Sequence, residues 1–203
     1  KHTNPCGFGL GDNITEAYKR AISTDPVSYF GGIVGFNKIV DIETAQELIQ
    51  PFLECIIAPS FSKEALEILK KKKNLRVISV NTDYNEAFIS IKSVAGGYLY
   101  QQRDSLQGGL NNLKIVTKRK PTNNEYNAMD VGWKLVRQVK SNAIVLADKI
   151  QLLGVGAGQM SRIDSVKIAI QKVTDNGLNL HGSIMASDAF FPFPDCVELA
   201  AAE

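Results

Sequence analysis

The spacing of hydrophobic positions changes several times along the chain, and these changes predict alternating strands and helices. Apolar runs of strand length occur at residues 33–36, 55–59 and 75–80, with amphipathic patterns before and between them. We predict helices at 14–23, 41–49 and 62–72. Asn13 with Glu16, and Asp41, have the side chains that cap helix N-termini. This alternation is typical of an α/β fold with parallel strands.

Short strand-like runs replace the alternation in the middle of the chain. They lie at residues 88–91, 97–102 and 113–116, with glycines at 96, 97, 108 and 109 between them. The basic stretch Lys118–Pro121 follows, and we interpret it as a boundary between two subdomains, 1–118 and 119–203. An amphipathic helix is predicted next, over 123–140, with Met129, Trp133 and Val136 on its buried side.

The second half is organised around two apolar runs, 143–147 and 150–154, which flank the polar pair Asp148-Lys149. This arrangement predicts a β-hairpin. Glycines at 154, 156 and 158 then predict a sharp turn in which no Cβ blocks a close neighbour. A helix follows and stops at Asn176-Gly177. Its predicted apolar face consists of Met160, Ile163, Val166, Ile170 and Val173.

Arg162 stands at the start of this last helix. Free backbone N–H groups, a positive helix end and an arginine together suit a phosphate or a carboxylate. The alternative is a tight strand-to-helix turn with Arg162 in an ordinary ion pair. The glycine run does not indicate a dinucleotide site, because Asp175, the acid at the expected distance, ends a helix rather than a strand.

Composition narrows the classes of partner. The 203 residues include 23 basic and 21 acidic side chains, a net charge of +2, so nothing indicates nucleic acid or an anionic membrane. No apolar run approaches the ~20 residues of a membrane span. The three cysteines are widely spaced, which favours a reducing cytoplasm over a disulfide framework. Both ends of the chain lie within patterned sequence, so we expect it to be a segment of a longer protein.

Three segments carry groups suited to chemistry. Lys1-His2 joins a cation to the side chain that transfers protons near neutral pH, although adjacent pairs of this kind usually arise by chance. Asn142, between two apolar elements, is predicted to be a buried amide that needs partners; a purely structural role is the alternative. The phenylalanines at 190, 191 and 193, interrupted by Pro192, suggest either a wall for a flat ligand ring or a plug over a core edge.

Six motifs occur in one order: Lys1-His2-x-Asn4-Pro5-Cys6-Gly7, Tyr29-Phe30-Gly31-Gly32, Ile56-Ile57-Ala58-Pro59, Ser141-Asn142, Gly154-x-Gly156-Ala157-Gly158-Gln159-Met160-Ser161-Arg162 and Ser187-Asp188-Ala189-Phe190-Phe191-Pro192-Phe193. Together they resemble the formyltransferase part of the bifunctional AICAR formyltransferase/IMP cyclohydrolase family of purine biosynthesis, along the whole chain. AICAR is 5-aminoimidazole-4-carboxamide ribonucleotide. The resemblance implies two cytidine-deaminase-like subdomains of three-layer α/β/α fold, the second one truncated here. It also implies a cytoplasmic homodimer with active sites near the interface.

The resemblance further implies transfer of a formyl group from 10-formyltetrahydrofolate to the 5-amino group of AICAR. By this likeness His2 is the general base, Lys1 is its cationic neighbour, and Asn142 orients the substrate or the developing oxyanion. The implied substrate-binding residues are Gly31, Glu54, Arg162, Phe190, Phe193 and Asp195. The likeness implies no catalytic metal, and a structural potassium ion near Asp188.

The chain also departs from the family pattern. Asp148 and Pro194 stand where lysine and arginine are frequent, and the family's stretch before Lys1, its closing stretch and its cyclohydrolase domain are not in this sequence. We therefore expect the isolated segment to be inactive and the longer protein to be active.

Two other classes of function remain open. One is a zinc deaminase or hydrolase of the same fold, although Cys6 has no second cysteine nearby. The other is a non-catalytic nucleotide-binding or assembly module in which Lys1 and His2 are dispensable.

Overall fold

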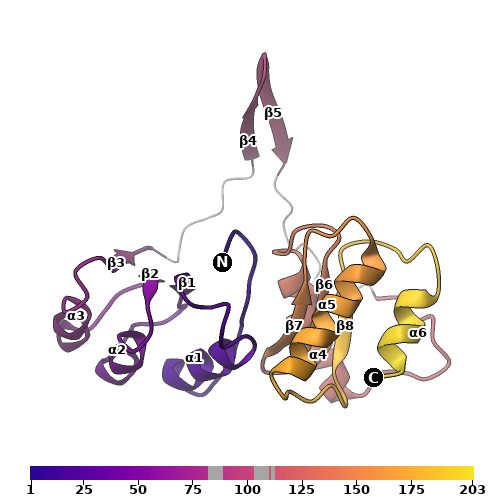
Figure 1. Ribbon diagram of the computed structural model, residues 1–203, viewed down its shortest axis with the longest axis horizontal. Coiled ribbons are helices and arrows are strands. Elements are labelled where there is room, and N and C mark those ends of the chain that lie inside the picture. Colours follow the sequence, from indigo (N-terminus) through magenta and orange to yellow (C-terminus); the bar gives the residue numbers. More distant parts are fainter. Residues whose placement is uncertain (82–88, 103–109, 111–112) are drawn as a thin grey trace.

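The computed structural model of the chain describes residues 1–81, 89–102, 110 and 113–203. Two three-stranded sheets lie in separate halves of the molecule, and a two-stranded hairpin comes between them in the sequence (Figure 1). Each sheet is accompanied by its own helices, which confirms the α/β fold class. The predicted subdomain boundary between residues 118 and 119 stays a prediction.

The first half alternates helices and strands as predicted. Its elements are α1 (Ile14–Ser23), β1 (Gly32–Gly35), α2 (Ile42–Leu48), β2 (Leu53–Ala58), α3 (Lys63–Leu69) and β3 (Arg76–Ser79). The strands pair in parallel in the order β1-β2-β3, and Figure 1 shows the three helices along one side of this sheet. Asn13 and Asp41 cap α1 and α2, each accepting a backbone N–H at 2.8 Å. Both capping predictions are confirmed.

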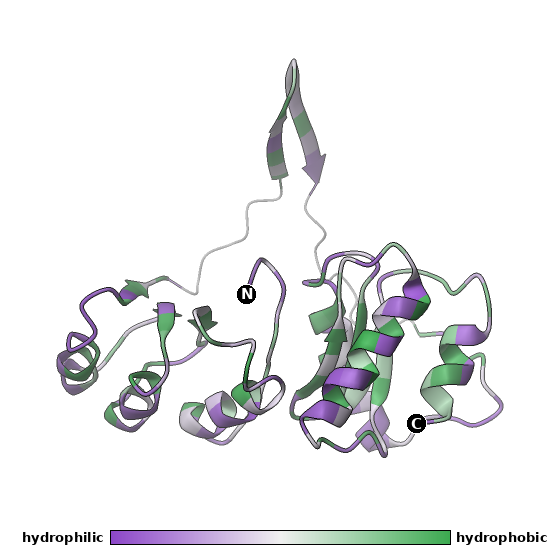
Figure 2. Ribbon diagram, viewed as in Figure 1, coloured by the Kyte–Doolittle hydropathy of each residue, from purple (hydrophilic) through white to green (hydrophobic). Residues whose placement is uncertain are grey.

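The second half is a helix–sheet–helix sandwich. It contains α4 (Asn123–Val136), β6 (Ile144–Ala147), β7 (Leu152–Gly156), α5 (Arg162–Asp175), β8 (Ile184–Ser187) and α6 (Asp195–Ala201). β6 is central and pairs antiparallel with both neighbours, so the predicted hairpin is confirmed. Ile144 and Leu146 of β6 pack with α5, whereas Val145 and Ala147 pack with α4. Figure 2 shows hydrophobic and hydrophilic residues alternating along α5, as expected of a helix with one buried face.

The middle of the chain is less regular than predicted. β4 (Ile89–Val94) and β5 (Gly97–Gln102) form an antiparallel hairpin that is exposed along its whole length. The predicted strand at 113–116 is wrong, since these residues form no strand. β propensity produces a strand only where a partner edge is available, and no described strand pairs with this run. Phe88 and the glycines at 108 and 109 lie outside the described residues.

Two predicted buried faces need correction. Trp133 of α4 is 46 % exposed, and the buried face of that helix is formed by Ala128, Val131, Gly132, Leu135 and Val136. A Cβ at Gly132 would lie 2.4 Å from the Ile184 side chain of β8, so the helix approaches the sheet closely at this position. Met160 is 93 % exposed because α5 begins only at Arg162. Val166, Ile170 and Val173 are buried as predicted.

Backbone pairing joins the two halves. Residues 8–10 pair antiparallel with residues 150–152, through N–H···O bonds of 3.0 Å and 2.7 Å, and thereby extend the second sheet beyond β7. The buried Thr24 hydroxyl, just after α1, donates to the Leu152 carbonyl at 2.6 Å. Asp25 forms an ion pair with Lys172 of α5 at 2.8 Å. The start of the chain is therefore held against the second half.

The glycine run at residues 154–158 differs from the predicted turn. Gly154 and Gly156 lie within β7, and only Gly158 has a left-handed backbone, with φ of 70°. The predicted close neighbour is confirmed, because a Cβ at Gly156 would lie 1.9 Å from the Ser165 carbonyl oxygen of α5. These glycines serve helix–sheet contact more than chain reversal.

Gly156→Ala is expected to lower the free energy of unfolding by about 1–3 kcal/mol or more, because α5 must move away from β7. Urea denaturation measures this change. Gly35→Ala is the matched control: it lies in β1, where an added Cβ meets nothing within 4 Å. We expect the control to be neutral or slightly stabilising, through the unfolded chain. Equal losses in the two variants would contradict the close helix–sheet contact.

Candidate active site

The chain begins with a tight turn that displays His2. The Asn4 N–H donates to the Lys1 carbonyl at 2.9 Å, which closes the turn over the two residues between them. His2 and Thr3 have positive φ values of 50° and 61°. The left-handed region is uncommon for residues other than glycine and most unusual for a β-branched threonine. Such conformations persist only where the surroundings hold them, and they concentrate at functional sites.

The Asn4 side chain attaches this turn to the second half of the chain. Its Oδ1 accepts the backbone N–H of Lys140 at 2.8 Å, and the Lys140 carbonyl in turn accepts the Gly158 N–H at 2.9 Å. Lys140 lies two residues before Asn142. The structure therefore brings the predicted Lys1-His2 pair and the predicted Asn142 to the same end of the second sheet.

Asn142 is half-buried and has the partners that the sequence predicted it would need. Its Nδ2 donates to the carbonyls of Gln159 and Met160, at 2.9 Å and 3.2 Å. Because both partners can only accept, this assignment of the amide is fixed. The Ser165 hydroxyl donates to the Asn142 carbonyl at 2.8 Å. Within the described part of the chain no donor reaches Asn142 Oδ1, so the group that Asn142 leaves free is a hydrogen-bond acceptor.

Arg162 forms the ion pair that the sequence left as an alternative. Its guanidinium donates to the Asp188 carboxylate at 2.6 Å and to the Ser187 hydroxyl at 2.8 Å. The side chains of Arg162 and Asp188 are largely buried, at 11 % and 22 % exposed. Asp188 also accepts the Ala143 N–H at 3.0 Å, so these bonds tie together the starts of β6 and α5 and the end of β8. The anion site predicted at this helix end stays a prediction.

The Asp188 carboxyl is held ionised by its neighbours. Burial alone would raise its pKa, but hydrogen bonds from Ser141, Arg162 and the Ala143 amide outweigh burial and lower the pKa below its usual value. Because the Arg162 guanidinium already balances this charge, the carboxylate fits a structural ion pair better than a ligand for potassium. The potassium ion near Asp188 stays a prediction.

Gly31 lies close to Lys1, and Glu54 points to a different partner. The Lys1 ammonium donates to the Phe30 carbonyl, and Gly31, with φ of 68°, donates its N–H to the Phe52 carbonyl at 2.8 Å. The rings of Phe30 and Phe52 are 5.3 Å apart between centroids. Glu54 forms an exposed ion pair with Arg76 of β3 at 2.6 Å. Gly31 thus joins the Lys1 side of the site.

The aromatic loop after β8 has two exposed rings and one packed ring. Phe190 and Phe193 are 79 % and 68 % exposed, whereas Phe191 packs against the core between α5 and the sheet. Asp195 is the first residue of the short helix α6, where its carboxylate accepts the Cys196 N–H at 2.8 Å. Two aromatic faces are therefore available for a flat ring, a few residues beyond Asp188.

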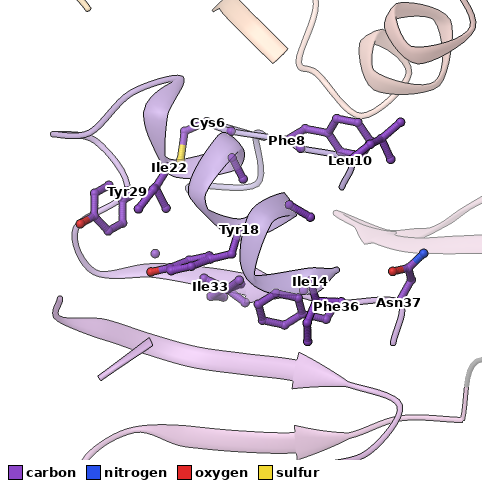
Figure 3. Close-up of a pocket in the computed structure, with 17 residues that line it drawn as sticks. Cys6, Phe8, Leu10, Ile14, Tyr18, Ile22, Tyr29, Ile33, Phe36 and Asn37 are labelled. Atoms are coloured by element: carbon purple, nitrogen blue, oxygen red, sulfur yellow. The ribbon is translucent and has the colours of Figure 1, made fainter. Parts of the chain in front are cut away.

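A cavity of about 310 Å³ lies between α1, β1 and residues 6–10 (Figure 3). Its lining is mainly apolar, and the Tyr18 ring lies 6.2 Å from that of Phe36 between centroids. The buried Tyr18 hydroxyl has no hydrogen-bond partner among the described residues, and burial raises the pKa of this phenol. None of the predicted site residues lines this cavity, so the candidate active site lies elsewhere, around the His2 turn and Asn142.

Asn4 belongs to the first motif, but the sequence alone gave it no role. The family resemblance placed Asp188 beside a potassium ion and did not predict it as the partner of Arg162. The available signal was Asn4-Pro5: an asparagine next to a proline is typical of a turn, and the turn carries the predicted base. Among the described residues no three His, Cys, Asp or Glu side chains gather as metal ligands would.

Residues 1–172 match the family described as AICARFT/IMPCHase bienzyme. The relatives include proteins called "Bifunctional purine biosynthesis protein PurH". The one from Thermoanaerobacter sp. (strain X514) is 52 % identical over 200 residues, which cover 98 % of this chain and 39 % of that protein. Those from Bacillus cytotoxicus and Bacillus thuringiensis (strain Al Hakam) are each 53 % identical over 202 residues, 99 % of this chain and 39 % of theirs.

The chain spans about two fifths of the length of these curated relatives. None of the helices in the described ranges is both long and apolar enough to cross a membrane. The family match extends over most of the chain, and the relatives share more than half of its residues across almost its full length. The chain therefore belongs to the AICARFT/IMPCHase bienzyme family.

Proposed function

We propose that this chain is the formyltransferase segment of a longer bifunctional enzyme of purine biosynthesis that acts in the cytoplasm. In this proposal it transfers the formyl group of 10-formyltetrahydrofolate to the 5-amino group of AICAR, and the longer protein also carries the cyclohydrolase. The observation that carries the proposal is the junction of the His2 turn with the Asn142 segment, through Asn4 and Lys140. Family membership supports it.

The reaction needs a base, because the attacking amine is conjugated with the imidazole carboxamide and is a poor nucleophile. As the amine nitrogen bonds to the formyl carbon, His2 takes its proton. The bond from that carbon to N10 of the folate then breaks, and the proton passes to N10. Negative charge develops on the formyl oxygen in between, and the Lys1 ammonium is the cation available to stabilise it.

The geometry of Asn142 supports one of its two implied roles. Its two Nδ2 hydrogens are directed at the Gln159 and Met160 carbonyls, so a negatively charged oxygen would have to displace one of them. Its free Oδ1 can accept an N–H of the 5-amino group. In this proposal Asn142 orients the amine, and Lys1 stabilises the oxyanion.

The exposed rings of Phe190 and Phe193 are proposed to contact the pterin. The chain is proposed to act as a homodimer, with the aromatic loop of one subunit near the His2 turn of the other. A two-fold interface would form two equivalent sites of this kind. The alternative, in which one chain builds the whole site, is separated from this proposal by the mixing experiment below.

His2→Ala in the full-length protein is expected to lower kcat for formyl transfer by about 10²- to 10⁴-fold, the range for loss of a positioned base. The affinity for AICAR should change little, because the imidazole acts during proton transfer and not in the binding of AICAR. Steady-state kinetics and calorimetry measure the two effects. His181→Ala is the matched control, because the chain has two histidines and His181 lies in an exposed turn. Near-normal turnover of His2→Ala would assign the proton to another group.

If Asn142 orients the amine, its hydrogen bond to the 5-amino group should already strengthen the binding of AICAR before the reaction. The unmodified protein should bind AICAR about 3- to 10-fold more tightly than the analogue with hydrogen in place of the 5-amino group, as expected for one hydrogen bond. In Asn142→Ala this preference should disappear. Calorimetry with both nucleotides, on the unmodified protein and on the variant, gives the four affinities that this comparison needs. A preference that persists in the variant would show that Asn142 does not hold the amine and would leave the oxyanion role.

Phe193→Ala is expected to weaken folate binding by tens of fold, since burial of a phenylalanine contributes on the order of 1.5–3 kcal/mol. Mixing this variant with His2→Ala tests the shared site. If the loop crosses the interface, half of the randomly mixed dimers carry one intact site, and activity returns to about a quarter of normal. His2→Ala mixed with Asn142→Ala is the control without recovery, because Asn4 ties these two positions together within one chain. No recovery with Phe193→Ala, despite demonstrated subunit exchange, would place the aromatic loop in its own chain's site.

A further inference from the structure

The His2 turn has an unfavourable backbone that its own residues do not explain. His2 and Thr3 occupy its two central positions, with φ of 50° and 61°. Turns of this hand are dominated by glycine, asparagine and aspartate, because other side chains clash with the backbone there. Among the described residues, the Thr3 hydroxyl has one partner, the neighbouring His2 carbonyl at 2.6 Å. The conformation therefore depends on contacts made outside these two residues.

Asn4 makes the contacts that hold the turn. Its backbone N–H closes the turn on the Lys1 carbonyl at 2.9 Å, and its Oδ1 accepts the Lys140 N–H at 2.8 Å. The second bond spans 136 positions of sequence, so it fixes the place of the turn as well as its shape. Lys1 adds a bond from its ammonium to the Phe30 carbonyl, on the side of the first sheet.

The anchor is itself well fixed. The Lys140 carbonyl accepts the Gly158 N–H at 2.9 Å, and two residues later the Asn142 N–H donates to the Gln159 carbonyl at 3.3 Å. The segment that receives Asn4 is therefore the segment that carries Asn142, and both belong to the framework at one end of β6 and β7. A displacement of Asn4 would move His2 relative to Asn142.

We propose that Asn4 is a positioning residue: through its bond to Lys140 it holds the His2 imidazole at the amine that Asn142 orients. The inference rests on the proposed function, since it assumes that His2 is the base. Asn4 needs no contact with substrate in this role. Its effect is on geometry, and a displacement of about 1 Å at a reacting group can cost on the order of 10²-fold in rate.

The test uses the full-length protein and three substitutions. Asn4→Ala is expected to lower kcat by about 10- to 100-fold with little change in the KM for AICAR. Asn4→Asp keeps an oxygen that accepts the Lys140 N–H and should restore kcat to within about 3-fold of normal. Asn13→Ala is the matched control. It removes an asparagine oxygen that accepts a backbone N–H at 2.8 Å in α1, and it should leave kcat unchanged.

A double substitution separates positioning from a general loss of structure. In the His2→Ala background, Asn4→Ala should lower kcat by less than about 3-fold further, because there is no base left to position. If Asn4→Ala lowered kcat in this background as much as it does when His2 is present, the proposal would be overturned. A normal kcat for Asn4→Ala would also overturn it. If Asn4→Ala does not fold, Asn4→Gln serves in its place, since the longer amide displaces the turn; its normal kcat would likewise overturn the proposal.

The outcomes also distinguish this inference from the function on which it rests. If His2→Ala itself retains near-normal turnover, the assigned base is wrong and the proposed function must be revised. If His2→Ala is inactive and Asn4→Ala is normal, the proposed function stands and the role of Asn4 is wrong.

Discussion

Burial of strand β6 on both faces confines the polar groups of the second half to the ends of its strands. Ile144, Val145, Leu146 and Ala147 are all buried, and they alternate between the α5 side and the α4 side of the sheet. A polar side chain along this strand would need its own buried hydrogen-bond partner. The buried Ser165 hydroxyl of α5 already donates to the Asn142 carbonyl, before the strand begins. Chemistry in this half is therefore restricted to the loops at the ends of the strands.

Antiparallel pairing then determines which loops meet. β6 starts where β7 and β8 end, because both neighbours run against it. Asn142, Arg162 and Asp188 are separated by 20 or more positions in sequence, yet they lie at this one end. Residues 8–10 run against β7 in turn, so the turn at residues 1–4 comes to the same end. Four distant segments meet there as a consequence of strand direction.

Local patterns in the sequence predicted the elements well and their long-range contacts poorly. The caps at Asn13 and Asp41 and the stop at Asn176-Gly177 depend on neighbouring backbone groups, and all three predictions were correct. Trp133 and the run at 113–116 were predicted wrongly because burial and strand pairing depend on partners far along the chain. The site residues came from motif resemblance, which carries identities and order. It carries no hydrogen-bond directions, so neither the free acceptor of Asn142 nor the anchoring by Asn4 could be predicted from it.

The charge balance at Arg162 bears on which part of a nucleotide it could meet. The Arg162 side chain is 11 % exposed and is paired with an Asp188 carboxylate that its neighbours keep ionised, so the pair presents almost no net positive charge. A phosphate dianion gains little from a compensated arginine, and the N-terminal end of α5 alone supplies only a partial charge. The described hydrogen bonds use a single nitrogen of the guanidinium, whereas the group has five N–H donors. In the proposed function, Arg162 would therefore meet a neutral oxygen, such as that of the carboxamide, rather than the phosphate.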